Sequence, residues 1–442
     1  MLRFRQLFLF ACLAIVFAGS FAGCKDSKNK SEIKAGKPGL AKPAVDFLPV
    51  GENPVELGGI AWGKNFAKAK LDADKKGKPI YLMLDEVPGC KGCKDFGTQV
   101  LSHPIVIAAV SEYFVPVFIN NRPDKYASDY DKKMVKYFKE SYWDYPVVRY
   151  LDEKEKDIIP RKQTLKLKEN INRIISVLKA RKVKLPIYLQ IADIENSNNR
   201  HETAYFNMGC FWSGEARLGK INGVLYQTFG FIKGSGGADE VVKVVYDPKI
   251  ISLEKLLKQA KHNMCATRFI ARNETQLKVA RKIWGKNAIL NKNDMREEEP
   301  QYYLKHGLPG IYFLPITPLQ AVKINSYYRE RKVWEMMLTP GQLDLAKRVE
   351  KLCKGKKAKQ IHKMFSDLKP DNYRRLNKET LCDYKIKFMQ VLDKLESQSA
   401  GKSEKKSSSD PACKSAENSL KCPTEKCSQP DCSSKSAPEA KN

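Results

Sequence analysis

The chain of 442 residues carries 79 lysines and arginines against 50 aspartates and glutamates, a formal net charge of +29 at pH 7. This length can bury two cores, since domains usually contain roughly 100 to 200 residues. The basic side chains are spread along the chain and are not gathered with aromatics into one motif, so we expect no nucleic-acid partner.

Residues 1–24 have the layout of a secretory signal: two arginines, an apolar run shorter than the ~20 residues that span a bilayer, then small residues up to Cys24. The end of this segment resembles a bacterial lipoprotein processing box, which implies cleavage before Cys24 and a lipid on its sulfur. We therefore expect a lipid-anchored protein of the bacterial cell envelope, facing the periplasm or the surface. The alternative is an ordinary signal with a stray cysteine. Residues 25–56, rich in Lys, Ser, Gly and Pro, are expected to form a flexible tether.

Residues 57–184 are predicted to form an α/β domain. The apolar pattern predicts a helix within 61–78, a strand at 79–87, a turn leading into a helix across 88–101, a strand at 112–120, a strand from 145 with a turn before a fourth strand, and a helix at 167–182. This order resembles the thioredoxin fold in its periplasmic branch.

Cys90 and Cys93, spaced as CxxC, lie at a predicted strand-to-helix junction. Unpaired amides at a helix N-terminus stabilise a thiolate, and a second thiol one turn later can close a disulfide. A structural disulfide or half of a metal site are the alternatives, although no second pair at zinc-like spacing lies nearby. The resemblance implies that Cys90 attacks, that Cys93 resolves, and that Pro146 is the cis-proline beside the pair. Gly89 departs from the family's usual aromatic, so the redox potential does not carry over.

Residues 185–345 show a different pattern. It predicts a strand at 202–208, a helix from 210, a strand at 223–232, a strand at 239–247 and an amphipathic helix at 252–263 opened by Ser252. The βαββα order favours a mixed α/β plait whose helices lie on one face of the sheet.

The run Gly-Cys-Phe-Trp-Ser-Gly-Glu at 209–215 resembles the active-site signature of A-type peptide-methionine sulfoxide reductases, and residues 237–257 resemble their following strand and helix. The resemblance implies that a Cys210 thiolate attacks the sulfoxide sulfur. Phe211 and Trp212 would then wall a pocket for the substrate methyl group. The alternative is that this run is simply part of a hydrophobic core.

Two acidic residues complete this constellation. The resemblance implies that Glu240 donates a proton to the sulfoxide oxygen, leaving a sulfenic acid on Cys210. Glu215, kept from the signature, is expected to support the helix or the site.

Several positions depart from the family pattern. Ala238 replaces a histidine, and Phe231, at a substrate-binding position, lacks the hydroxyl of the family's tyrosine. Near the end of the domain, Asn325 and Ser326 stand where we expect the family's His-Gln pair. A family loop is shortened and brings in Cys265, which we expect either to form a reversible disulfide with Cys210 or to be a small buried hydrophobe.

Residues 346–397 are predicted to be a helical extension in which Cys353 and Cys382 form a disulfide or act as further resolving thiols. Residues 398–442 lack aromatics and periodicity and are expected to be disordered. The tail cysteines could bind soft metals, but their spacing is not that of a closed zinc site, so we expect no metal and no cofactor. They are Cys413, Cys422, Cys427 and Cys432.

Together these patterns favour a thiol oxidoreductase that reduces methionine sulfoxide in oxidised envelope proteins. The thioredoxin-like domain would supply electrons to Cys210 and would itself draw on a membrane or periplasmic thiol reductant. One alternative is a thiol–disulfide oxidoreductase whose second domain only selects partners. Another is a non-enzymatic metal-binding or scaffolding lipoprotein.

Overall fold

The computed structural model describes residues 53–234, 236–262, 266–353, 363–365, 367–370, 374 and 380–400. Several predicted features lie outside these residues: the signal-like segment with Cys24, most of the predicted tether, Cys265 and the four tail cysteines. None of the helices within the described residues has the length and apolar character needed to cross a membrane.

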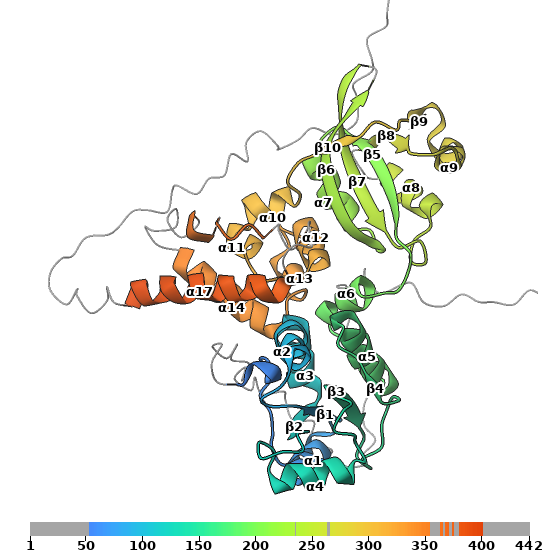
Figure 1. Cartoon of the computed structure of the whole chain (residues 1–442). Helices are drawn as coiled ribbons and strands as arrows, with labels where there is room; N and C mark the ends of the chain where they lie inside the picture. Colours follow the sequence, from blue (N-terminus) through green and yellow to red (C-terminus); the bar gives the residue numbers. More distant parts are fainter. Residues whose placement is uncertain are drawn as a thin grey trace, which may run out of the picture. The chain divides into compact units, whose positions relative to one another are not determined.

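The first sheet forms where the sequence predicts buried strands. Its order is β2-β1-β3-β4, with β1 parallel to β2 and antiparallel to β3 (Figure 1). The strands are β1 (Ile80–Asp85), β2 (Val115–Asn120), β3 (Val147–Leu151) and β4 (Lys162–Gln163). All six residues of β1 are buried, as expected for a central strand covered on both faces.

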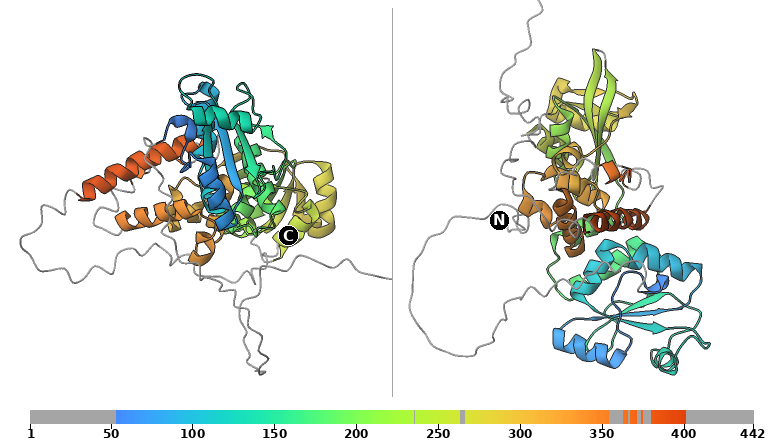
Figure 2. Two further views of the ribbon diagram at one scale, coloured as in Figure 1. Left: turned by 90° about the horizontal axis from the view of Figure 1, so that it is seen from below. Right: turned by 90° about the vertical axis from the view of Figure 1, so that its left-hand side faces the viewer.

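Helices cover both faces of this sheet (Figure 2). Leu82 and Leu84 point to the side of α1 (Phe66–Lys76) and α4 (Asp129–Tyr137). Tyr81 and Met83 point to the side of α3 (Pro104–Tyr113) and α5 (Leu167–Ala180). The alternation follows from the two-residue period of a strand. Helices α3 and α4 were not predicted from the sequence.

The CxxC segment continues β1 into a helix. After β1 the chain forms α2 (Lys91–Phe96) and η2 (Gly97–Leu101), and the short turn η1 (Val55–Leu57) packs against both. The packing is close: a Cβ added at Gly97 would lie 2.0 Å from the carbonyl oxygen of Val55. The end of the predicted tether, from Asn53 onward, is therefore ordered against this helix.

The second sheet has the order β10-β6-β7-β5-β8-β9. Its strands are β5 (Glu202–Met208), β6 (Val224–Gly234), β7 (Gly237–Tyr246), β8 (Ala266–Ala271), β9 (Ala288–Leu290) and β10 (Met295–Glu297). The helices α7 (Phe211–Gly219), α8 (Leu253–Lys261) and α9 (Glu274–Trp284) share one core with a single face of the sheet; η3 (Gly285–Asn287) follows α9. The predicted βαββα order and one-sided cover are confirmed, and Ser252 caps α8 as expected.

A further core is mainly helical, with Leu225 of β6 as its one strand residue within the described part of the chain. It contains residues of α6 (Ile187–Glu195), α11 (Pro309–Tyr312), α12 (Pro318–Ser326), α13 (Arg331–Glu335), α14 (Pro340–Cys353) and α17 (Leu381–Ala400), together with Leu304 of α10 (Tyr302–Gly307). The domain boundary expected at 345–346 falls inside α14, so the helical extension shares its core with the preceding helices. Helix α17 continues past 397 into the first residues of the expected tail.

We expect Gly97→Ala to lower the free energy of unfolding by about 1–3 kcal/mol, the usual penalty for overpacking, because the new methyl group would overlap the backbone of η1. Urea unfolding measures the change. Gly236→Ala is the matched control, since a Cβ there meets no atom within 4 Å. Equal effects of the two substitutions would contradict this account of the packing.

Candidate active sites

The first candidate site is the cysteine pair at the start of α2. Cys90 occupies the N-cap position and is exposed, while Cys93 is buried, and their Sγ atoms lie 3.3 Å apart as free thiols. The Tyr145–Pro146 peptide bond, immediately before β3, is cis, as the resemblance implied. The Val87–Pro88 bond, just before the pair, is cis as well.

Asp85 is a functional candidate that the sequence reasoning missed. It ends β1, is completely buried, and interacts with the Cys93 thiol. Burial raises the pKa of Asp85 to about 7, although its hydrogen bonds partly oppose the shift. The pKa of the Cys93 thiol is raised as well, mainly by burial and secondly by the nearby Asp85 carboxyl. The buried thiol therefore has a carboxyl group beside it that can exchange a proton near neutral pH.

Glu56 fixes the loop that carries Cys90. Its buried carboxylate accepts a hydrogen bond of 2.9 Å from the amide of Gly89. A Cβ at Gly89 would lie 2.5 Å from the Glu86 carbonyl oxygen and 2.6 Å from Cβ of Cys93, which explains why no aromatic side chain stands there. The sequence assigned Glu56 to the tether, because nothing local indicates that it is buried.

The second candidate site lies where β5 passes into α7. Cys210, half-buried, is the N-cap residue of α7. The next residue, Phe211, donates its amide to Oε2 of Glu240 at 3.0 Å. Glu240 lies on β7 directly opposite Phe231 of β6. The fold thus brings the carboxylate expected to act as an acid to the residue that follows the candidate nucleophile.

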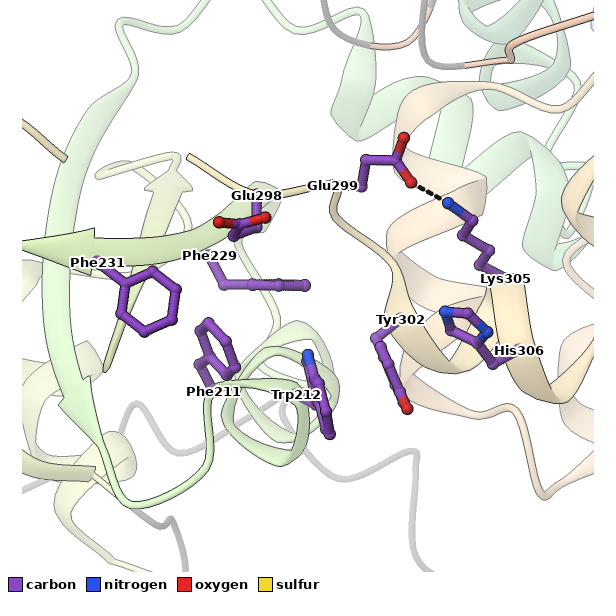
Figure 3. Close-up of a pocket in the computed structure, with 9 residues that line it drawn as sticks. All are labelled: Phe211, Trp212, Phe229, Phe231, Glu298, Glu299, Tyr302, Lys305 and His306. Atoms are coloured by element: carbon purple, nitrogen blue, oxygen red, sulfur yellow. Dashed lines mark hydrogen bonds and ion pairs between the residues drawn. The ribbon is translucent and has the colours of Figure 1, made fainter. Parts of the chain in front are cut away.

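An aromatic pocket of about 450 Å³ opens beside these residues (Figure 3). The Phe211 ring lies 4.6 Å from Phe229 and 5.3 Å from Phe231, and Trp212 stacks on Tyr302 at 3.9 Å between ring centroids. Its lining residues are Phe211, Trp212, Phe229, Phe231, Glu298, Glu299, Tyr302, Lys305 and His306. The three aromatics expected from the sequence therefore line one pocket.

The far wall of this pocket was not predicted. Tyr302, Lys305 and His306 belong to α10, some ninety residues beyond Trp212, and Glu298 and Glu299 precede that helix. Asn325 and Ser326, expected near the site, do not line the pocket. Asn325 is buried behind it, where its Oδ1 accepts the amide of Leu304.

Glu215 connects the two walls. It is 1% exposed and accepts hydrogen bonds from the backbone amides of Gln301 at 2.6 Å and Tyr302 at 3.2 Å, and from Nδ2 of Asn325 at 3.2 Å. This carboxylate therefore anchors the start of α10 to α7. The expectation that Glu215 supports the site has a geometric basis in these contacts.

The remaining cysteines provide little evidence for a functional site. Cys382 is a buried thiol whose pKa burial raises to about 12. Its expected pairing with Cys353 lies outside the side chains that the structure describes. The expected Cys210–Cys265 disulfide lies outside the described residues. Across the residues that the structure describes, no group of three or more His, Cys, Asp or Glu side chains is placed to hold a metal ion.

Residues 202–264 match the family model for peptide methionine sulfoxide reductase. A peptide methionine sulfoxide reductase of Methanococcus maripaludis is 42% identical over 69 residues, which cover 13% of this chain and 44% of that protein. One from Drosophila melanogaster is 38% identical over 78 residues, which cover 16% and 32%. The chain thus spans less than half the length of these curated relatives. Among solved structures, a DsbH oxidoreductase is 16% identical with a TM-score of 0.25, covering 29% of this chain and 90% of that one, a likeness too low to establish a shared fold.

We expect Asp85→Asn to change how stability depends on pH. The folded carboxyl titrates at about 7 and the unfolded one near its ordinary value of about 4. The folded state therefore binds more protons between these values, and wild-type stability falls as pH rises through that window. With the cysteines reduced, the free energy of unfolding of Asp85→Asn should rise relative to that of the wild type by roughly 2–3 kcal/mol between pH 5 and pH 8.

Urea unfolding at several pH values measures this difference. Asp72→Asn is the control, because its side chain is 45% exposed, and its curve should run parallel to that of the wild type. Parallel curves for Asp85→Asn and wild type would show that Asp85 keeps an ordinary pKa.

We expect Glu215→Gln to loosen the pocket wall. The amide nitrogen of glutamine would face donors that now meet carboxylate oxygens, and an unsatisfied buried donor costs about 1–3 kcal/mol. Near-ultraviolet circular dichroism should also lose signal from the Trp212–Tyr302 stack. The exposed Glu254→Gln serves as control, and an unchanged spectrum for Glu215→Gln would contradict the anchoring role.

Proposed function

We propose that this protein reduces methionine sulfoxide in oxidised proteins, with Cys210 as the nucleophile. The observation that carries the proposal is the hydrogen bond from the Phe211 amide to Glu240, which joins a carboxylate to a residue that follows Cys210 directly and lines an aromatic pocket. The match of residues 202–264 to the reductase family supports the same chemistry. Phe211, Trp212 and Phe231 would enclose the apolar part of the substrate.

The reaction follows from these groups. The Cys210 thiolate attacks the sulfoxide sulfur, the sulfur–oxygen bond of the substrate breaks, and Glu240 supplies the proton that the oxygen requires. The products are methionine and a sulfenic acid on Cys210, so the substrate sulfur gains the two electrons that the cysteine sulfur loses. A thiol then attacks the sulfenic acid, forms a disulfide and releases water.

The CxxC segment is proposed as the electron source. We predict that residues 57–184 form a thioredoxin-like domain. Three features support this prediction: a CxxC pair at a helix start, cis-Pro146 and the pairing of β1 with β2 and β3. Cys90 would attack the disulfide formed at Cys210, and Cys93, deprotonated by Asp85, would then release the Cys210 thiol and close the Cys90–Cys93 disulfide. Placing donor and acceptor on one chain raises their effective concentration.

The same proposal assigns the protein to the bacterial cell envelope. It rests on the two arginines, the apolar run and the lipoprotein-like box that ends at Cys24. A lipid on Cys24 would anchor the chain to the membrane, where a membrane or periplasmic thiol reductant would return electrons to the Cys90–Cys93 disulfide. Metabolic labelling with a fatty acid, lost in Cys24→Ala, tests the anchor.

We expect the purified chain to turn over a peptide containing the S epimer of methionine sulfoxide with dithiothreitol as reductant. Cys210→Ser should abolish turnover because the nucleophile is lost. Cys90→Ser should retain it, since dithiothreitol can reduce the Cys210 site directly. Chromatography of the peptide products measures the rate. Absent turnover in the wild type, beside intact disulfide reduction that depends on Cys90, would contradict the proposed function and favour a thiol–disulfide oxidoreductase.

A further inference from the structure

Phe231 leaves the proposed site without the hydroxyl that the family resemblance places there. A sulfoxide oxygen carries substantial negative charge and is a strong hydrogen-bond acceptor, so a site that stabilises it needs a donor. Glu240 can supply one proton but cannot also act as a permanent donor once it is ionised. The question is which other side chain reaches this position.

The strand register places Arg296 next to Phe231. Phe231 on β6 lies opposite Glu240 on β7 and, on its other side, opposite Arg296 on β10. Side chains directly opposite one another on adjacent strands point to the same face of a sheet. Arg296, Phe231 and Glu240 therefore form one row across three strands, on the face that carries α7 and the pocket.

The side-chain geometry agrees with the register. The guanidinium carbon of Arg296 lies 5.0 Å from the centre of the Phe231 ring. Arg296 does not itself line the pocket, but it pairs at 3.4 Å with Glu298, which does, so its charged end lies within ion-pair distance of a pocket-lining residue. The Arg296 side chain is 74% exposed, which leaves its N–H groups accessible to a ligand.

The backbone holds Arg296 in this place. A Cβ at Gly230 would lie 2.0 Å from the Arg296 carbonyl oxygen, so β10 can approach β6 this closely only because residue 230 is glycine. Just beyond β10, the amide of Glu298 donates to the carbonyl of Phe229 at 2.8 Å. The neighbouring Glu297 points to the opposite face and pairs with Lys243.

We propose that Arg296 binds the sulfoxide oxygen of the substrate and takes the place of the hydroxyl that Phe231 lacks; this inference rests on the proposed function. A guanidinium group carries five N–H donors, so Arg296 can bind the oxygen without leaving Glu298. Its charge-assisted hydrogen bond strengthens as negative charge grows on the departing oxygen. Since arginine stays protonated, Glu240 remains the proton donor and Arg296 holds the oxygen in place.

The test compares Arg296→Met with the wild type in turnover of the methionine S-sulfoxide peptide with dithiothreitol. We expect kcat/KM to fall about 100-fold, the effect of removing one donor from an oxyanion site, and Arg296→Lys to recover part of it. Phe231→Tyr in the Arg296→Met background should restore activity, because the added hydroxyl supplies a donor in the same row. The control Lys243→Met, on the opposite face of the sheet, should stay close to wild type. Equal kcat/KM for Arg296→Met and wild type would overturn the inference.

A binding measurement separates this inference from the proposed function. Cys210→Ser is titrated by calorimetry with an N-acetylated methionine S-sulfoxide peptide and with its sulfide counterpart. We expect a preference for the sulfoxide that disappears when Arg296→Met is added, whether or not the wild type turns the peptide over. Equal affinity for the two peptides, or a preference that survives Arg296→Met, would overturn the role of Arg296. Absent turnover with an Arg296-dependent preference would contradict the proposed function alone.

Discussion

The candidate reductase site depends on one buried carboxylate. Glu215 accepts hydrogen bonds from the Gln301 and Tyr302 amides and from Asn325. A buried charge is tolerated only when several donors surround it. Those donors come from α12 and the start of α10, while Glu215 itself belongs to α7. These hydrogen bonds to Glu215 hold α10 against α7, where Tyr302 stacks on Trp212 and both line the pocket together with Phe211, the residue after Cys210.

The cysteine pair depends on a comparable arrangement of buried acids. Glu56 holds the Gly89 amide, and Asp85 lies beside Cys93. In the first case a carboxylate satisfies a backbone donor and orients the loop that carries Cys90. In the second, burial moves the titration of the carboxyl into the neutral range, where it can accept the proton of a buried thiol. One acid therefore shapes the loop, and the other lies where it can exchange a proton with the Cys93 thiol.

What the sequence could predict is the part determined by local pattern. The strands at 202–208 and 239–247 and the helix capped by Ser252 follow from alternation, periodicity and capping, and they formed as predicted. Cys90 and Cys93 could be singled out by their CxxC spacing, and Cys210 by the glycine before it and the two aromatics after it. The structure adds how they are supported, through contacts with residues far along the chain.

The remaining features depend on tertiary contacts that no local pattern reveals. The sequence predicts that Glu56 belongs to a polar tether. It is buried because η1 packs closely against Gly97. In the sequence, Tyr302 and His306 resemble ordinary surface aromatics. They line the pocket because Glu215 binds the start of their helix. Arg296 sits in a run of charged residues, and its position opposite Phe231 follows from the register of a three-residue strand.

The most direct test of the central claim, that Cys90 and Cys93 pass electrons to Cys210, is the yield of methionine from fully reduced protein with no added reductant. After a pulse of methionine S-sulfoxide peptide, the account predicts one more equivalent of methionine per chain from the wild type than from Cys90→Ser, because the CxxC pair can reduce Cys210 once. Cys210→Ser should yield none. Equal yields from the wild type and Cys90→Ser would contradict the account.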